Sequence, residues 1–468
     1  MFELHDLTAL DQLGQLRRGE LGPRALAEHY LERIERIDPA LGAFTTVTRD
    51  TALQRADALE HAVPRAAALW GLPLAEKDLW SRAGVRTTFG SRAFEHFVPE
   101  ASDEIADTLD AAGAVSLGKT STPEFGLASY TESLVAAPTR TPYDLSLGAG
   151  GSSGGAAAAV AAGLLPVAPA SDGGGSIRIP AAATGLVGLK PSRGRVPSGS
   201  GFLSLAGLVS FGAVARTVAD AALVLDAIAG PSPWSVGPPT WDGGAYLNAA
   251  VRGEGRFQLG VMTSSPWEDS HDIVIAPEAR AALDAAVREL AAIGHGLEET
   301  SLETEPYGEH FRVIWQASAA GIPVDGDRLH LLEPLTRWLV ERGRALPVRT
   351  LTAALSWLSG YERRVIRRFA PFDAVLTPAL ALAPRPVGWY DAEDGERNFD
   401  QQVEYTPWTS FVNVAGLPAI VLPVHHTEDG LPMGVQLIGR PGGEDVLLSI
   451  GAQLERRLRW QRRHPANW

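Results

Sequence analysis

Two serines, Ser152 and Ser176, each lie in a glycine-rich stretch that could support acyl transfer. The stretches read Gly150-Gly-Ser-Ser-Gly-Gly155 and Asp172-Gly-Gly-Gly-Ser-Ile-Arg-Ile-Pro180. Glycine has no Cβ, so its backbone can approach a ligand closely. The three glycines before Ser176 could turn successive N–H groups toward one point beside its hydroxyl, as an oxyanion hole requires. Either stretch alone is more often structural, so the hypothesis depends on the two together.

Lysine is rare in this chain, and one lysine is a candidate base. Of 41 basic residues only Lys77, Lys119 and Lys190 are lysines. Arginine cannot lose its proton in a protein, whereas a buried lysine can become a neutral amine. A serine hydroxyl is a poor nucleophile unless a base takes its proton, and a neutral amine could be that base. Genomic base composition could produce the same bias, so the count alone assigns no role.

Residues 113–120, Gly-Ala-Val-Ser-Leu-Gly-Lys-Thr, match the phosphate-binding loop G-x-x-x-x-G-K-[ST]. Such a loop must connect a strand to a helix, so that its backbone N–H groups surround the phosphates. Here the intervening residues are themselves strand-like and follow a predicted helix, and Pro123 suits only the first turn of a new helix. Nucleotide binding is therefore a remote alternative, and we expect Lys119 to be structural.

Residues 150–154 match G-x-S-x-G, the nucleophile elbow of α/β-hydrolases. That motif needs a strand immediately before it and an acid and a histidine later in the chain. Residues 141–149 instead indicate a turn-rich loop, and none of the 11 histidines is a clear general base. The chain also lacks H-E-x-x-H, the usual ligand helix of zinc hydrolases. The elbow is disfavoured, and no metal site is predicted.

The elements that must position these residues alternate between helices and strands, which predicts an α/β layered fold. Apolar spacing predicts a first helix capped by Asp6 or Thr8, a second after Gly22-Pro23, and others at residues 104–112, 217–229 and 276–293. Strands are predicted at residues 72–75, 114–117, 419–424 and 433–438, the last two joined by a turn at 428–430. Residues 154–170 indicate a buried helix followed by a turn. The composition shifts at residues 230–242, the best candidate boundary.

Bulk composition reduces the classes of partner that the protein is expected to bind. The formal net charge of −14 disfavours nucleic acid and anionic membranes, because both bind clustered Lys and Arg. No stretch has the ~20 strongly apolar residues of a membrane span. With no cysteine, disulfides and thiolate metal sites are excluded, and no signal peptide is visible at the N-terminus. We therefore expect a cytoplasmic protein that binds neither nucleic acid nor membrane.

Several separate motifs, in order along most of the chain, resemble the amidase signature family. They are Gly71-Leu-Pro-Leu-Ala-Glu-Lys77-Asp78, Gly118-Lys-Thr120, Pro123-Glu-Phe-Gly126, the block 150–190, Ala215-Arg-Thr-Val-Ala-Asp220, Phe372-Asp-Ala-Val-Leu-Thr-Pro378, Gly416-Leu-Pro-Ala-Ile420 and Gly430-Leu-Pro-Met-Gly-Val-Gln436. The resemblance implies a single α/β/α layered domain over residues 1–468, with a central mixed sheet flanked by helices. Its catalytic core would cover about 65–225 and 370–455, and a variable, substrate-shaping segment about 230–410.

The resemblance also implies the catalytic roles. Ser176 would be the acyl-forming nucleophile, Ser152 the middle serine after a cis peptide from Gly151, and Lys77 the base at the far end of the relay. The remaining implied site residues are the oxyanion-hole residues Gly173, Gly174 and Gly175, with the N–H of Ser176; the supporting residues Ser153, Asp172 and Arg178; and the acyl-side pocket residues Gly126, Leu127 and Ser129. No cofactor is implied.

Substrate and assembly remain open from the sequence. Ser171-Asp172-Gly173, Ala149 and Ser133 depart from the common family pattern, which puts substrate preference in doubt rather than activity. Residues 313–326 lack the Glu-Ala…Arg-Tyr-Asp-Gly stretch of the tRNA-linked members, so we expect a stand-alone hydrolase.

The expected substrate is a small apolar, aryl or aminohexanoate-type amide; a carbamate or ester is the alternative, and a non-catalytic amide-binding homologue is a third interpretation. A homodimer is among the states left open. Eight of the twelve tryptophans lie between Trp234 and Trp408, and they could line a pocket or pack the core.

Overall fold

An eight-stranded mixed sheet forms the centre of the computed structural model, which describes residues 3–197, 202–230, 245–466 and 468. In sheet order its strands are β10 (Gly296–Glu299), β9 (Gln258–Val261), β11 (Ala374–Pro378), β13 (Pro432–Gly439), β12 (Ala419–His426), β7 (Val187–Lys190), β8 (Ser210–Ala215) and β6 (Val167–Asp172). The first three run parallel and every later pairing is antiparallel. The predicted α/β fold with a central mixed sheet is confirmed.

Two smaller sheets accompany it. The first has the order β1 (Phe44–Val47), β3 (Val115–Thr120), β2 (Pro73–Lys77), with β2 and β3 parallel. The second pairs β4 (Arg140–Thr141) with β5 (Asp144–Gly148). Strand β2 lies beside β6 without pairing to it, so the small sheet and the large sheet meet at these two strands.

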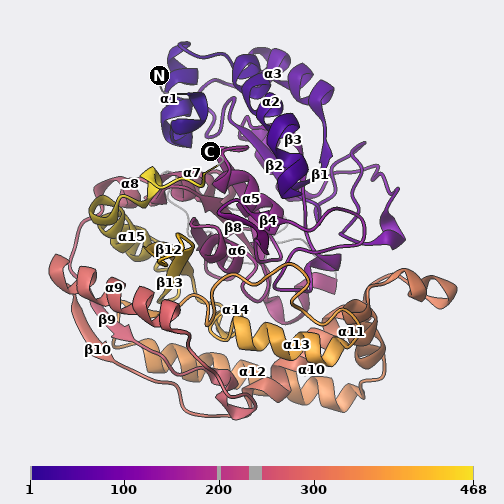
Figure 1. The fold of residues 1–468 in the computed structure, drawn as a ribbon, viewed down its shortest axis with the longest axis vertical. Coiled ribbons are helices and arrows are strands. Elements are labelled where there is room, and N and C mark those ends of the chain that lie inside the picture. The colour runs from indigo at the N-terminus through magenta and orange to yellow at the C-terminus, as the bar shows by residue number, and fades with distance from the viewer. Residues whose placement is uncertain (1–2, 198–201, 231–244, 467) are drawn as a thin grey trace.

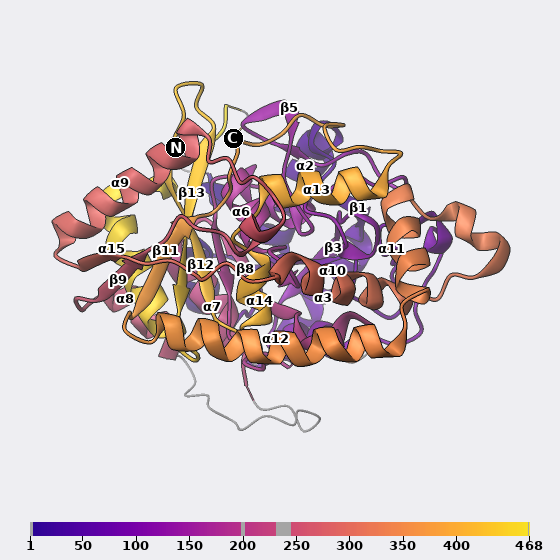
Figure 2. The same cartoon turned by 90° about the horizontal axis from the view of Figure 1, so that it is seen from below.

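Helices surround the sheets (Figure 1). They are α1 (Ala9–Arg18), α2 (Pro23–Leu41), α3 (Arg49–Ala62), α4 (Glu104–Ala111), α5 (Gly154–Ala161), α6 (Arg178–Ala183), α7 (Val218–Ile228), α8 (Ala245–Arg252), α9 (Pro277–Ile293), α10 (Tyr307–Ala320), α11 (Pro334–Arg344), α12 (Val348–Phe369), α13 (Gly395–Tyr405), α14 (Ser410–Val414) and α15 (Glu444–Leu458). Figure 1 shows α1–α3 on the opposite side of the molecule from α10–α13, and in Figure 2 α12 runs along one edge.

Local signals in the sequence placed several elements correctly. Thr8 caps α1 and Thr217 caps α7, each accepting a hydrogen bond from the N–H three residues ahead. Pro277 begins α9, and Gly294 ends it in the left-handed conformation. The strand pair β12–β13 also matches the prediction. These features depend on short-range chemistry, which the sequence displays directly.

One expectation was incomplete and one was wrong. Residues 154–170 do begin with a buried helix, α5 (Gly154–Ala161), and a turn follows it, but β6 begins at Val167, where no strand was predicted. The apolar content of this stretch reflects burial of both elements, and a short buried helix and a buried strand have similar compositions. Residues 144–148, expected to be a loop, form β5 in the two-stranded sheet.

In the middle of the chain, the expected variable segment contributes strands to the central sheet. The candidate boundary at 230–242 lies, apart from Gly230, outside the described residues. Strands β9 and β10, from the expected variable segment, extend the same sheet as β7 and β12. Among the described helices, none combines the length and apolar character that crossing a bilayer would need.

Candidate active site

Three connections bring the chemistry-bearing residues together. Lys77 is the last residue of β2, Ser152 lies between β5 and α5, and Ser176 lies between β6 and α6. Because β2 lies beside β6, and α5 contacts both strands, the three connections converge where the two sheets meet. Ser152 and Ser176 line the same cavity, whose volume is about 480 Å³.

Lys77 is buried and touches the middle serine. Its Nζ donates a hydrogen bond to Ser152 Oγ at 2.7 Å and one to Ser171 Oγ at 3.3 Å. Burial lowers the pKa of Lys77 to about 7, although the charge of Asp172 favours the protonated amine. A substantial fraction of Lys77 is therefore neutral near neutral pH, and a neutral amine can accept a proton from the hydroxyl that it contacts. Ser171 is a contact that the sequence did not suggest.

The backbone around Ser152 is tightly packed. The Gly151–Ser152 peptide is cis, as the resemblance implied. A Cβ on Gly151 would lie 2.3 Å from the carbonyl oxygen of Tyr130, so this position accepts only glycine. The next residue, Ser153, donates from its N–H to Ser176 O at 3.1 Å and from its hydroxyl to Ser171 O at 3.2 Å. Ser153 therefore links the Ser152 turn to the Ser176 loop.

A buried ion pair holds the Ser176 loop. Arg178 Nη2 lies 2.8 Å from Asp172 Oδ1, and both side chains are fully buried. Burial alone would raise the pKa of Asp172, but the Arg178 guanidinium keeps it well below its usual range. Asp172 also accepts hydrogen bonds from the N–H groups of Gly175 (2.8 Å) and Ile177 (3.1 Å). The carboxylate therefore fixes the backbone on both sides of Ser176.

The bond to Asp172 changes the expectation for the oxyanion hole. The N–H of Gly175 is occupied by Asp172 Oδ1, and Gly175 lines neither cavity at the site. Its φ of 133° is one that L side chains rarely adopt, and a Cβ there would lie 2.5 Å from Thr409 Oγ1. Gly175 thus allows the loop to adopt its conformation. Gly173, Gly174 and Ser176 line the cavities, and they remain the proposed oxyanion donors.

Residues near the C-terminus complete the support, and the sequence did not single out their roles. Thr409 Oγ1 donates to Gly174 O at 2.6 Å. Arg178 donates to Asn413 Oδ1 and to Gln436 Oε1, each at 2.6 Å. These side chains are more than 200 residues from Arg178 in sequence, and only Gln436 lay in a motif quoted for the family resemblance. A polar residue inside a buried segment is the one signal that could have found them.

Two cavities meet at Ser176. The smaller, of about 60 Å³, is lined by Gly126, Leu127, Ala128, Ser129, Gly174, Ser176, Ile179, Trp267, Phe311, Trp315, Phe399, Gln402, Val403, Thr406, Thr409 and Ser410. The larger also contacts Gly126, Leu127 and Trp315. The expected acyl-side residues Gly126, Leu127 and Ser129 thus lie beside Ser176. Of the described tryptophans between Trp234 and Trp408, Trp267 and Trp315 line the site, whereas Trp408 is fully buried.

The other two lysines have different surroundings. Residues 115–120 of the phosphate-loop match form strand β3, so no loop between strand and helix is present there. Lys119 is buried and donates to the carbonyl of Trp80. Burial also lowers the pKa of Lys190 to about 7, but its Nζ donates to Pro191 O at 2.8 Å. A lowered pKa therefore does not distinguish Lys77; its contact with Ser152 does.

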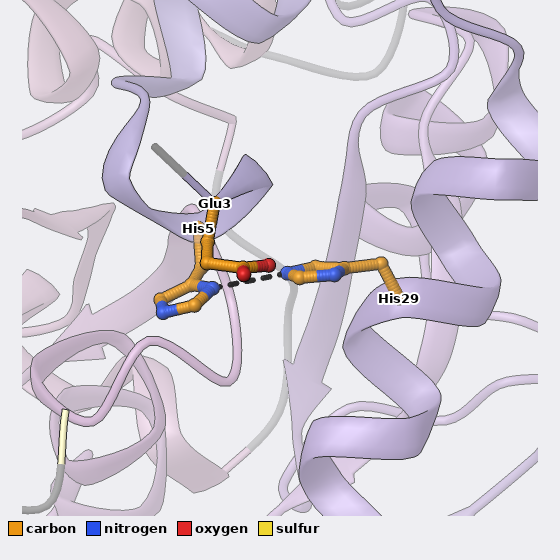
Figure 3. Close-up of side chains that lie close together, drawn as sticks. All are labelled: Glu3, His5 and His29. Carbon is orange, nitrogen blue, oxygen red and sulfur yellow. Dashed lines mark hydrogen bonds between the residues drawn. The ribbon is translucent and has the colours of Figure 1, made fainter. Parts of the chain in front are cut away.

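One group among the described residues has side chains close enough to hold a metal ion: Glu3, His5 and His29 (Figure 3). The two imidazoles are hydrogen-bonded to each other, with His5 Nδ1 at 3.2 Å from His29 Nε2. Burial and the nearby charge of Arg33 lower the pKa of His5 to about 4. The same positive charge would oppose a bound cation. None of these three side chains lines either cavity at Ser176.

Comparison with known proteins identifies relatives along nearly the whole chain. The family model described as Amidase matches residues 25–448. A Mycobacterium tuberculosis protein named "Putative amidase AmiB2" is 36% identical over 98% of this chain and 97% of its own length. A Roseiflexus sp. protein, one subunit of glutamyl-tRNA(Gln) amidotransferase, is 35% identical over 99% of this chain and 98% of its own. The structure of 6-aminohexanoate cyclic dimer hydrolase complexed with substrate superposes with a TM-score of 0.90 at 30% identity, covering 99% of this chain and 100% of that one.

Proposed function

This chain belongs to the amidase family and is a hydrolase of amide bonds, and we propose that it acts through an acyl-enzyme on Ser176 with Lys77 and Ser152 as its proton relay. The observation that carries the proposal is the 2.7 Å contact between Lys77 Nζ and Ser152 Oγ. A buried amine with a pKa of about 7 is suited to take a proton at neutral pH and to return it later. Ser152 and Ser176 share a cavity in which the relay could reach a substrate.

The reaction follows from this arrangement. Neutral Lys77 takes the hydroxyl proton of Ser152 as Ser152 takes the proton of Ser176, and Ser176 Oγ attacks the amide carbonyl carbon. N–H groups of Gly173, Gly174 and Ser176 stabilise the oxyanion that forms. Ser152 then gives a proton to the leaving nitrogen and is reprotonated by Lys77, so the C–N bond breaks and the amine departs. Water attacks the ester on Ser176 with the same relay acting as base, which releases the acid.

The substrate class is drawn from the relatives and from the cavities. The similar solved structures include 6-aminohexanoate cyclic dimer hydrolase and a bacterial aryl acylamidase, the latter 25% identical with a TM-score of 0.86. We propose a small apolar, aryl or aminohexanoate-type amide, cleaved in the cytoplasm without a cofactor. A carbamate or ester could use the same relay, because the attack on the carbonyl carbon is the same. A tRNA-linked role stays disfavoured, because residues 313–326 lack the stretch that the tRNA-linked members carry.

Covalent labelling tests the proposal. A fluorophosphonate reacts with an activated serine, so the intact protein is expected to gain one adduct, mapped to Ser176 by peptide mass spectrometry. Ser176→Ala is the matched control and is expected to remain unlabelled and inactive toward a 4-nitroanilide. Equal labelling of wild type and Ser176→Ala, or no labelling of wild type, would contradict the proposal. A thermal shift with ATP that Lys119→Ala removes would instead support nucleotide binding.

A further inference from the structure

We propose that the two cavities at Ser176 sort the two halves of the substrate, with a compact acyl group in the smaller cavity and a bulky, mainly apolar amine in the larger. The substrate class would then be short-chain acyl amides of large amines, which keeps the aryl amides of the proposed function and excludes aminohexanoate-type amides, whose acyl chain is longer. This inference rests on the proposed relay, because it uses the position of Ser152 to orient the amide.

The orientation follows from where the proton must go. In the relay Ser152 protonates the leaving nitrogen, so that nitrogen must lie on the Ser152 side of the scissile bond. Ser152 lines the larger cavity and is absent from the walls of the smaller one. The amine therefore departs into the larger cavity, and the acyl substituent lies on the opposite side of Ser176.

The smaller cavity has little room. Its volume of about 60 Å³ holds roughly four to six non-hydrogen atoms, at about 10–15 Å³ for each water-sized sphere. An acetyl or butanoyl chain fits this space, whereas a longer chain must displace the walls or leave through the open side of the cavity, where it loses contact with them. The larger cavity, of about 480 Å³, lies in the usual range for drug-sized ligands. Trp80 and Phe211 line one part of it with their rings in edge contact, and Ser102, Asp103 and Glu104 line another, which suits an amine with an aromatic body and a polar end.

The walls of the smaller cavity resist expansion because they are packed against one another. The ring centroid of Phe311 lies 5.6 Å from that of Trp267 and 5.5 Å from that of Trp315. Both indole N–H groups are also anchored, Trp267 to Ser410 Oγ at 3.2 Å and Trp315 to Leu127 O at 3.3 Å. Moving one ring breaks contacts with the others, and close-packed interiors tolerate such shifts poorly. The rings of the wall therefore hold one another in place, and this keeps the smaller cavity small.

A panel with one leaving group tests the acyl preference. Acetyl, butanoyl and octanoyl 4-nitroanilides share the same amine, so differences in kcat/KM report the acyl cavity. We expect octanoyl to fall at least about 100-fold below the better of the two short chains. The acetyl amide of 7-amino-4-methylcoumarin, a larger amine, is expected to stay within about tenfold of acetyl 4-nitroanilide.

Two identical substitutions in the two cavities test the assignment. Val403 lines only the smaller cavity and Val209 only the larger. Val403→Ala is expected to raise the octanoyl-to-acetyl ratio of kcat/KM at least about fivefold, because it removes two methyl groups from the restricting wall. Val209→Ala is expected to leave that ratio within about twofold. Phe399→Leu, on the smaller cavity alone, is a second variant in case Val403→Ala does not fold.

The outcomes separate this proposal from the proposed function. Octanoyl turnover equal to that of the short chains, or relaxation of acyl preference by Val209→Ala rather than Val403→Ala, overturns the cavity assignment while fluorophosphonate labelling of Ser176 stands. Absence of labelling on Ser176 together with absence of anilide hydrolysis overturns the proposed function, and this inference with it.

Discussion

Replacing Lys77 with methionine is expected to abolish activity and at the same time to stabilise the protein at pH 7 and below. Lys77 is fully buried, and its pKa falls from 10.5 to about 7. That drop corresponds to about 5 kcal/mol of unfavourable free energy for the charged amine in the folded state. Methionine has a similar length and carries no charge. It gives up the hydrogen bonds to Ser152 and Ser171, each about 1 kcal/mol, so a net gain of about 3 kcal/mol is expected.

The difference in stability between wild type and Lys77→Met is expected to depend on pH. Between pH 7 and 10.5 the unfolded chain keeps the proton of Lys77 while the folded chain releases it. The unfolded state then binds more protons, so the stability of the wild type rises with pH, whereas Lys77→Met lacks this contribution. The free energy of unfolding of wild type minus that of Lys77→Met is therefore expected to increase by about 2 kcal/mol from pH 7 to pH 9.

Urea titration read by pulse proteolysis at each pH measures this difference. Lys190→Met is the matched control, since burial lowers the pKa of Lys190 to about 7 as well. The difference in free energy of unfolding between wild type and Lys190→Met is expected to rise with pH in the same way. The fluorophosphonate is still expected to label Ser176 in this variant. Wild-type kcat/KM is expected to rise with pH through about 7, as Lys77 becomes neutral. A difference between wild type and Lys77→Met that stays constant from pH 7 to pH 9 would show that Lys77 is charged in the folded protein and would refute the relay.

Three further substitutions probe the support of the site. Ser152→Ala is expected to lower kcat at least about 100-fold on a 4-nitroanilide, because it interrupts the relay; a near-normal rate would exclude Ser152 as its link. Thr409→Val removes the 2.6 Å bond to Gly174 O and is expected to lower kcat about tenfold with little change in KM; a raised KM with kcat unchanged would point to lost binding instead. Arg178→Met leaves the carboxylate of Asp172 buried and unpaired, so urea titration is expected to show a loss of about 3–5 kcal/mol; a loss below about 1 kcal/mol would contradict the ion pair's role.

Motif chemistry was visible in the sequence where the physical cause is local. The glycines around Ser152 and before Ser176 predicted close backbone packing, and Gly151 does lie against Tyr130. Threonine caps and proline starts predicted helix ends because those effects act within one turn. Strand β6 was missed at the end of residues 154–170, since local composition does not separate a buried helix from a buried strand.

Support for the Ser176 loop could not be predicted in the same way. Asn413 and Gln436 reach Arg178 from positions more than 200 residues away, and apart from their polarity within buried segments nothing in the sequence marks that contact. The hydrogen bond from Gly175 to Asp172 likewise reassigns a glycine that the family resemblance placed in the oxyanion hole. The contacts with Asn413 and Gln436 depend on how distant segments pack around α6, whereas the bond from Gly175 joins residues only three apart and depends on the conformation of the loop.

By itself, the sequence determined which side chains could do chemistry: two glycine-flanked serines and three lysines in a chain that otherwise uses arginine. The tertiary structure decided which lysine contacts a serine and how much room lies on each side of Ser176. Lys77 and Lys190 have similar pKa values because both are buried, yet only Lys77 meets Ser152, since α5, which begins just after Ser152, packs against β2 and β6. Residue type sets which protons can move, whereas burial and strand packing set their pKa and their partners.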